Sequence, residues 1–229
     1  MKKLIGILGG MGPEATAFFL TEFVKCRHAT CDQEHVPIIA LSCPDIPDRS
    51  SYLLSGGISP LPKLQEYVSL LESSGAKCIV IACNTAHFWL KDLNFQPSTT
   101  VIDMIKCTVN SIIKRKIKNI CILATDGTIN SKLYQNSLSR YGVRFTVPNK
   151  EQQKYVMSSI YQIKSGLNVD VMGFADAVIN PLQSEGVDCF LMGCTELPIL
   201  LRKLKSKTLF ISSTREAVLS AISWYDTNK

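Results

Sequence analysis

The feature that most constrains the fold is a regular alternation between short apolar runs and longer helical patterns. The apolar runs are five or six residues long and are found at Leu4–Leu8, Val36–Leu41, Lys77–Ala82, Asn119–Ala124, Cys189–Gly193 and Thr208–Ser212. Between them lie patterns typical of helices, at Glu14–Cys26, Pro60–Ser74, Met104–Lys116, Asn130–Tyr141, Lys150–Ser165, Gly173–Glu185 and Thr214–Tyr225. Each apolar run is continuous rather than alternating, as in strands covered on both faces of a parallel sheet. The alternation therefore predicts a doubly wound α/β architecture.

Within this alternation, one half of the chain resembles the other. "GAKCIVIACNTAH" begins at Gly75 and "GVDCFLMGCTELP" begins at Gly186, with cysteines at matching places in both. "KKLIGILGG" near the start likewise resembles "IKNICILAT" at residues 117–125. Strands of α/β proteins look alike, so a trivial likeness stays open, but the repeated order of both elements favours a duplication. We predict two pseudo-symmetric lobes with parallel-rich sheets and an active site between them, at the carboxyl ends of the strands.

The lobe boundaries are predicted from the segment that joins the two halves. "NFQPSTTVID", at residues 94–103, leads from the first half into the second. The final helical pattern follows the last strand and is expected to return to the first lobe. We therefore expect residues 1–98 and 212–229 to form the first lobe and residues 99–211 to form the second.

Length, composition and charge exclude several classes of protein. The chain has 229 residues, 46% of them hydrophobic, and no apolar run reaches the roughly 18 residues that span a bilayer. The basic start precedes an apolar run too short for a signal peptide, so we expect a cytoplasmic protein without a membrane partner. The net charge of +6 is modest, and lysines gather at residues 112–119 and 200–208, near helix ends where the dipole favours cations. No known nucleic-acid-binding motif accompanies these lysines, so we predict no nucleic-acid partner.

The nine cysteines are not expected to form disulfides, because their number is odd and a cytoplasmic chain of this size needs no disulfide framework. Cys78, Cys121 and Cys189 lie within apolar runs and are predicted to be core residues. Residues 26–35 contain two cysteines and two histidines, but their spacing matches no zinc pattern. We therefore predict no metal site.

Two of the cysteines are candidates for chemistry because each follows a predicted strand and precedes small polar residues. Cys83 lies in "ACNTAH" and Cys194 lies in "GCTELP". Near a helix N-terminus the pKa of a thiol falls from about 8.5 toward neutrality. Taken singly, each could be either a buried filler or a reactive group, but at equivalent points of two facing lobes they are predicted to act together. His87, four residues after Cys83, is expected to hydrogen-bond the loop or a substrate.

Three other stretches carry candidate binding residues. "GGMGPEAT", at residues 9–16, has the glycine spacing of a dinucleotide site, but no ribose-binding acid follows the second strand. A small anion at the helix start, or a tight turn alone, is expected there instead. Arg49 in the proline-stiffened "CPDIPDRSS" suits a carboxylate, with an ordinary surface arginine as the alternative. Thr128 in "LATDGT" offers a hydroxyl to a ligand. Lys164 in "YQIKSG" ends a helix before Gly166, and the helix dipole alone would also explain a positive charge at that place.

These motifs occur together in one known family. "GGMGPEAT", "IPDRS", "ACNTAH", "LATDGT", "YQIKSG" and "GCTELP" stand in the family's order over nearly the whole chain, and by them the sequence resembles the aspartate/glutamate racemases, most closely the aspartate racemase branch. The resemblance implies two α/β lobes, a homodimer and racemisation of a small acidic amino acid without a cofactor. It also implies that Cys83 and Cys194 are the paired catalytic bases. Substrate contacts would come from Met11, Arg49, Asn84, Thr85, Thr128, Lys164 and Thr195. Cys43 departs from the family, whose members often have asparagine there, and this bears on substrate fit.

Racemisation explains why two thiols would be needed. One proton leaves one face of Cα and another is returned to the opposite face, so one protonated and one deprotonated group must flank the substrate. A cysteine hydrolase would need one thiol and a histidine, which leaves the second thiol unused. Two alternatives stay open: a related isomerase of the same fold, of the maleate or hydantoin type, and a non-catalytic protein that binds a small acid. The sequence does not choose between aspartate and glutamate.

Overall fold

Two parallel four-stranded sheets form the framework of the protein, as seen in a computed structural model that describes residues 3–204 and 207–228. The first sheet has the order β2-β1-β3-β4, with strands at Leu4–Gly9 (β1), Ile38–Ser42 (β2), Ala76–Ile81 (β3) and Thr100–Ile102 (β4). The second has the order β6-β5-β7-β8, with strands at Asn119–Leu123 (β5), Arg144–Thr146 (β6), Cys189–Met192 (β7) and Leu209–Ser212 (β8). The two orders are the same when each sheet is numbered from its own first strand, so the predicted pseudo-symmetry is confirmed.

Two of these strands are absent from the sequence prediction. β4 and β6 are three residues long and pair only at one edge of each sheet, with β3 and β5 respectively. Neither is fully buried, so neither carries the continuous apolar run that marks a strand inside a parallel sheet. Edge strands of this length leave little trace in a sequence.

The predicted long helices are found within a few residues of their expected bounds: α1 (Pro13–Arg27), α3 (Leu61–Ser73), α4 (Met104–Lys114), α7 (Lys150–Lys164) and α11 (Ser213–Thr227). Their ends follow capping chemistry. Asp103 caps α4 by accepting from the Lys106 backbone N–H, and Asn149 and Gln152 form a capping box at the start of α7. Gly166 takes a positive φ of 73° directly after α7, as expected for a helix C-terminus.

Two predicted helices are interrupted. The pattern at residues 130–141 is split into α5 (Asp126–Asn130) and α6 (Leu133–Arg140), because Lys132 adopts a left-handed φ of 56°. The pattern at residues 173–185 is divided into α8 (Val171–Phe174), a π-helical turn η3 (Ala175–Ile179) and α9 (Asn180–Ser184). Pro181 lies at the start of α9 and has no N–H for the regular helical ladder.

Four short helical segments carry or flank the sequence motifs: η1 (Asp32–Glu34), α2 (Arg49–Ser55), η2 (Thr85–Trp89) and α10 (Leu197–Leu201). The sequence predicts a loop at residues 43–51, but α2 begins at Arg49, with Asp48 accepting a hydrogen bond from the Ser51 N–H as its cap. The two predicted cysteine motifs end in short helices, η2 and α10.

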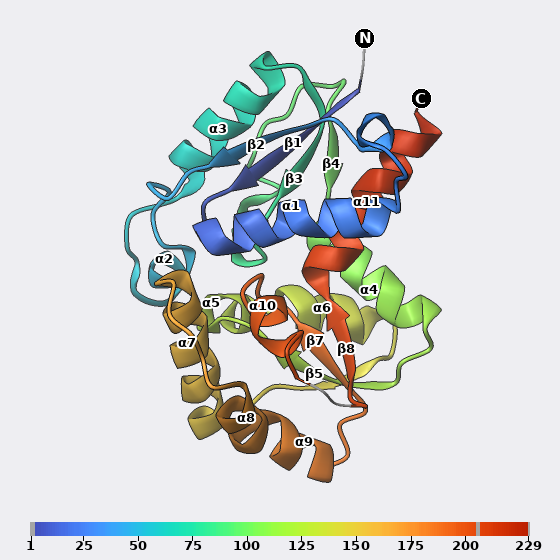
Figure 1. The fold of residues 1–229 in the computed structure, drawn as a ribbon. Helices are drawn as coiled ribbons and strands as arrows, with labels where there is room; N and C mark the ends of the chain where they lie inside the picture. Colours follow the sequence, from blue (N-terminus) through green and yellow to red (C-terminus); the bar gives the residue numbers. More distant parts are fainter. Residues whose placement is uncertain (1–2, 205–206, 229) are drawn as a thin grey trace.

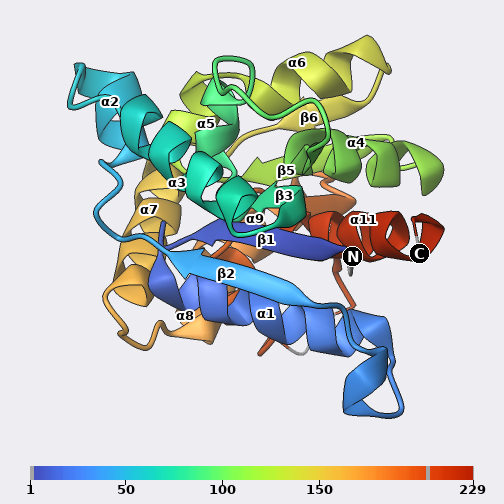
Figure 2. The ribbon, with the colours of Figure 1, turned by 90° about the horizontal axis from the view of Figure 1, so that it is seen from above.

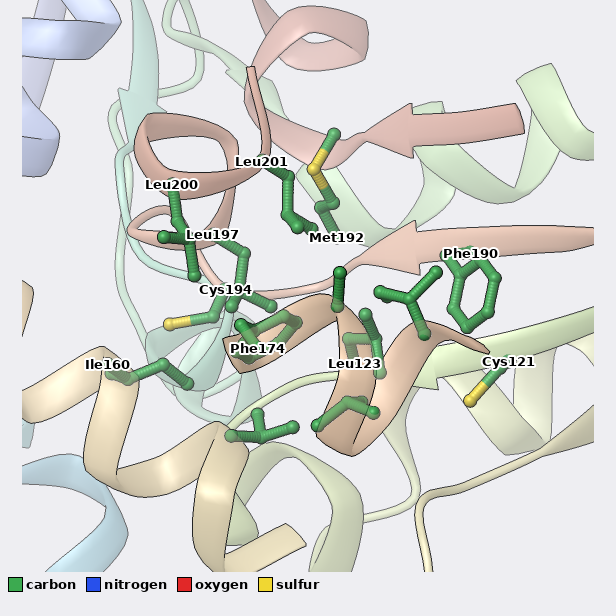
Figure 3. Close-up of a cluster of buried hydrophobic side chains, with 14 of the residues drawn as sticks. Cys121, Leu123, Ile160, Phe174, Phe190, Met192, Cys194, Leu197, Leu200 and Leu201 are labelled. Atoms are coloured by element: carbon green, nitrogen blue, oxygen red, sulfur yellow. The ribbon is translucent and has the colours of Figure 1, made fainter. Parts of the chain in front are cut away.

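Helices cover both faces of each sheet (Figures 1 and 2). In the first sheet, α1 and α11 pack on one face and α3 on the other. In the second, α7 to α10 pack on one face, and α4 and α6 on the other. Figure 3 shows one of these cores, with Cys121 at one border of the cluster and Cys194 at the other. Cys78, Cys121 and Cys189 are fully buried, and burial raises the pKa of each thiol to about 12, which confirms them as core residues.

The chain passes from the first sheet to the second after β4 and returns after β8 (Figure 1). The final helix lies beside the first sheet, since α11 packs against α1 and the Trp224 indole donates to the Thr100 hydroxyl at 3.0 Å. The expected lobe boundaries stay a prediction. The pairing of β4 with β3 places residues 100–102 in the first sheet. Part of the second lysine run, residues 205–206, lies outside the described residues. Among the helices of the described chain, none is long and apolar enough to cross a membrane.

Candidate functional site

Cys83 and Cys194 lie at equivalent points of the two sheets and line the same pocket. Each is the second residue after its strand, β3 or β7. The residue before each cysteine donates its backbone N–H to the neighbouring strand, Ala82 to the Leu8 carbonyl and Gly193 to the Leu123 carbonyl, both at 2.8 Å. The pocket is completed by Met11, Asp48, Arg49, Ser50, Asn84, Thr85, Thr125, Lys164, Thr195 and Glu196. The structure therefore brings together all the predicted site residues except Thr128, which lies directly behind Thr85.

Cys194 is hydrogen-bonded to a carboxylate that the sequence prediction did not assign to the site. Its Sγ donates to Oε2 of Glu196 at 2.8 Å, and the Thr195 hydroxyl donates to the same oxygen at 3.2 Å. Burial raises the pKa of Cys194 well above its usual range, and the negative charge of Glu196 adds to the effect. Cys194 is therefore a thiol at neutral pH. The signal available in the sequence was a carboxylate two residues after a candidate cysteine.

Three threonine hydroxyls join the two halves of the pocket. Oγ1 of Thr85, from the first half of the chain, lies 2.9 Å from Oγ1 of both Thr125 and Thr128. Thr125 also caps α5 by accepting from the Thr128 backbone N–H at 3.2 Å. Thr128 thus contributes to the site through Thr85, rather than by facing the pocket as predicted.

Asn84 is held by two residues that sequence reasoning missed. Its Oδ1 accepts a hydrogen bond from the Tyr134 hydroxyl, and its Nδ2 donates to the Ser213 Oγ at 3.0 Å. Ser213 in turn donates to the Met192 carbonyl at 2.8 Å. Tyr134 and Ser213 occupy ordinary helical positions in α6 and α11, and no signal in the sequence marks them. The amide of Asn84 is therefore fixed from the opposite sheet.

Arg49 braces the loops around it instead of presenting a free guanidinium. Its Nη1 donates to the carbonyls of Ile46 and Pro47, both at 3.0 Å, and its Nη2 donates to the Met11 carbonyl at 3.1 Å. Its Nε is buried and finds no acceptor among the described residues. These contacts use three of the five guanidinium N–H groups, so a substrate carboxylate would meet the Nε side of a guanidinium that is already anchored.

The backbone of the glycine turn before α1 packs closely against the residues around it. Gly10 has a φ of +88°, and a Cβ at this position would lie 2.0 Å from the Cys43 backbone nitrogen, so only glycine fits. The Gly10 N–H donates to the Thr16 hydroxyl at 2.7 Å. The Gly10 N–H is therefore taken by Thr16, and the turn brings Met11 to the pocket. A small anion at the start of α1 stays a prediction.

Lys164 and His87 complete the electrostatics of the site. Burial opposes the charge of Lys164, but Glu196 and Cys194 outweigh it and raise the pKa of the ammonium. His87 is buried and makes the predicted loop contact, since its Nδ1 lies 2.8 Å from the Cys83 carbonyl and its Nε2 accepts from the Met104 N–H at 3.1 Å. Neither nitrogen is left for a metal, and residues 3–204 and 207–228 contain no cluster of three metal-ligating side chains.

The space between the two cysteines is small. It amounts to about 10 Å³, which is enough for about one water molecule. An amino acid is larger, so the residues around this space must move before a ligand can lie between the thiols.

The chain is similar to known proteins in both sequence and fold. A sequence model described as "Asp/Glu/Hydantoin racemase" matches residues 8–221. The broad specificity amino-acid racemase RacX of Bacillus subtilis (strain 168) is 24% identical over 235 aligned residues, covering 97% of this chain and 98% of that protein. Glutamate racemase of Corynebacterium glutamicum is 32% identical over 154 residues, covering 64% of this chain and 55% of the relative. The solved structure of Picrophilus torridus aspartate racemase has a TM-score of 0.89 and 31% identity, over 98% of this chain and 94% of that chain.

Proposed function

The chain belongs to the Asp/Glu/hydantoin racemase family, and we propose that it interconverts the enantiomers of an acidic amino acid, aspartate or glutamate, without pyridoxal phosphate. The observation that carries the proposal is the placement of Cys83 and Cys194 at equivalent strand ends, facing one pocket. A substrate between them would meet one sulfur on each side. Aspartate is the first choice, because the aspartate racemase of Picrophilus torridus aligns over nearly the whole chain.

In the proposed reaction, each cysteine serves one face of the substrate Cα. The thiolate form of Cys83 removes the Cα proton, and the C–H bonding electrons pass into an enolate of the carboxylate. The Cys194 thiol then donates its proton to the opposite face of Cα, which leaves Cys83 protonated and Cys194 as a thiolate. The reverse reaction runs through the same steps with the roles exchanged. Before a second turnover in the same direction, one proton must leave Cys83 and one must return to Cys194, whose sulfur lies 2.8 Å from Oε2 of Glu196.

The groups around the cysteines would stabilise the enolate. Asn84, Thr85 and Thr195 line the pocket, and hydrogen-bond donors fixed in advance stabilise charge that develops in the transition state. Arg49 Nε and the Lys164 ammonium provide positive charge at the same place. Closure of the lobes on the substrate would exclude water and strengthen these interactions.

The test is hydrogen exchange at Cα in heavy water, combined with racemisation of L- and D-aspartate and L- and D-glutamate without added cofactor. Because acid–base groups contribute about 10²- to 10⁴-fold to rate, we expect Cys83→Ser and Cys194→Ser each to lower racemisation by at least about 10²-fold. Cys31→Ser is the matched control, since Cys31 is an exposed free cysteine. Wild-type rates in both site variants would rule out the two-cysteine mechanism, and ligand binding without any exchange would favour a non-catalytic binding protein.

Two further parts of the proposal rest on the family resemblance. We propose a cytoplasmic protein that assembles as a homodimer. Sedimentation velocity of the full chain measures its mass in solution directly. A single species at the 25.4 kDa of one chain would contradict the dimer.

A further inference from the structure

Glu196 has one buried carboxylate oxygen without a partner. The side chain is 1% exposed, and its Oε2 accepts from both Cys194 and Thr195. Oε1 is also buried, and no group in the described parts of the chain donates to it. A buried oxygen that has lost water without gaining a hydrogen bond carries a substantial free-energy cost. Such an atom in a pocket wall therefore needs an explanation, and a ligand that donates to it is the direct one.

On the side of the glycine turn, no side chain of the described residues fills the space beside Oε1. A Cβ on Gly12 would lie 3.3 Å from Oε1 and 3.4 Å from Cγ of Lys164, so the glycine turn keeps this side free of a side chain. Lys164, a cation of the same pocket, has its ammonium over the Tyr161 ring, 5.6 Å from the ring centroid. Asp48, the other carboxylate of the pocket, already caps α2 through the Ser51 N–H at 2.7 Å. Glu196 is thus the carboxylate in this pocket with a free acceptor.

We infer that Oε1 of Glu196 accepts the α-ammonium group of the substrate, and that the site consequently selects ligands with a free amine. The inference rests on the proposed function and names its substrate class. An ammonium offers three N–H donors and a positive charge, and charge-assisted hydrogen bonds of this kind are about 2.7–2.9 Å long. Maleate has neither a donor nor a positive charge, and a hydantoin offers only neutral ring N–H groups. Both fit this oxygen worse than an amino acid does.

This contact also places the reacting carbon. The two oxygens of one carboxylate would hold the substrate nitrogen and the Cys194 sulfur at the same time. Cα is bonded directly to that nitrogen, so fixing the nitrogen on Oε1 brings Cα next to Sγ. A single side chain would then both recognise the amine and set the approach of the proton donor, the kind of positioning on which rates depend strongly.

The experiment compares ligands that differ only in the amine. Binding of racemic aspartate and of succinate to the wild-type protein and to Glu196→Gln is measured by titration calorimetry. A racemic mixture is used because turnover then causes no net change. The substitution keeps the size of the side chain but removes its charge. We expect the wild-type protein to bind aspartate at least about tenfold more tightly than succinate, and the variant to lose this preference through weaker aspartate binding, with succinate unchanged or tighter. Glu185→Gln, which makes the same change at an exposed carboxylate outside the pocket, is the matched control and retains the preference.

Three other binding results would overturn the inference. Equal affinities for aspartate and succinate in the wild-type protein overturn it. This comparison needs no variant, so the inference can be tested even if the Glu196→Gln protein does not fold. Equal loss of both ligands in the variant indicates a structural role, and unchanged aspartate binding excludes the contact. A wild-type protein that shows the amine preference but no exchange at Cα would refute the proposed racemisation alone. Racemisation without an amine preference would refute this inference alone.

Discussion

At the scale of single residues, His87 shows how the first half of the site is held. It is a buried imidazole whose two nitrogens connect the Cys83 carbonyl to the first N–H of α4. These two contacts define the neutral ring, with Nδ1 as donor and Nε2 as acceptor. Burial lowers the pKa of His87 below the usual 6.5, although the nearby Asp103 acts in the opposite direction. Protonation of Nε2 would break its hydrogen bond with the Met104 N–H and would place a positive charge in a buried site away from water.

This predicts a loss of stability in mild acid. Below about pH 6.5 the unfolded chain binds a proton at residue 87 and the folded chain does not, so the free energy of unfolding falls as the pH falls. The slope from this one group reaches about 1.4 kcal/mol per pH unit until the folded histidine itself titrates. Urea unfolding between about pH 7 and pH 5 measures it. His87→Asn should be less stable at neutral pH but show a shallower slope, and parallel curves for the two proteins would assign the pH dependence to other groups.

The residues differ in how far the sequence could predict them. Cys83 and Cys194 were predicted because each follows an apolar run within a motif. The end of such a run is visible in the local sequence, and it marks the edge of the sheet where functional residues lie. Tyr134 and Ser213 were missed because their only link to the site is a hydrogen bond to Asn84, which is 50 and 129 residues away in the chain. Arg49 was predicted at the right place, but its use depends on three carbonyls whose directions are set by the folded loops.

At the scale of elements, the first half of the site is shaped by two helices from the second half of the chain. α6 supplies Tyr134 to Asn84, and α5 supplies Thr125 and Thr128 to Thr85. The strands and long helices that frame these contacts could be predicted, because periodicity and caps are local. The breaks at Lys132 and before Pro181 could not, nor could edge strands of three residues. These features depend on packing between elements rather than on a repeating pattern.

Tyr134→Phe tests the contact between α6 and the Cys83 motif. The change removes one hydroxyl and leaves the buried Oδ1 of Asn84 without its donor, which typically costs about 1–3 kcal/mol of stability. We expect a matching fall in the free energy of unfolding, and a fall in kcat/KM because the amide is free to rotate. Tyr141→Phe is the matched control, since Tyr141 is exposed at the end of the same helix. Equal effects of the two changes would show that Asn84 is held by something other than Tyr134.

At the scale of the whole molecule, the two lobes are packed closely enough to leave almost no room between the cysteines. α2 and α5 pack tightly against each other, because a Cβ on Gly127 would lie 2.7 Å from the Ser50 hydroxyl and 2.9 Å from its Cα. Glycine at this position therefore permits the closed arrangement. Ligand binding and lobe movement are linked, because the same residues line the pocket and the interface.

Gly127→Ala is expected to hold the lobes apart. The new methyl group meets the Ser50 backbone, which cannot rotate away as a side chain can, and a displacement of about 1 Å in an active site lowers activity by about 10²-fold. Steady-state kinetics with aspartate measure the loss. Small-angle scattering with saturating racemic aspartate should give a larger radius of gyration for the variant than for the wild-type protein. Removing the Ser50 side chain in the double variant Ser50→Gly, Gly127→Ala should restore part of the activity, and full activity of the single variant would show that closure at this contact is not required.

The path of the chain has a mechanical consequence. The described polypeptide crosses between the sheets at two places, after β4 at Ile102 and between β8 and α11 at Ser212. Two lobes joined by two chain segments rotate most easily about the line through those segments. One of the two crossings is followed directly by Ser213, which holds the Asn84 amide. A rotation of one lobe against the other about this line would therefore turn close to the pocket, leaving the residues beside Ser213 nearly in place and separating those on the far side the most.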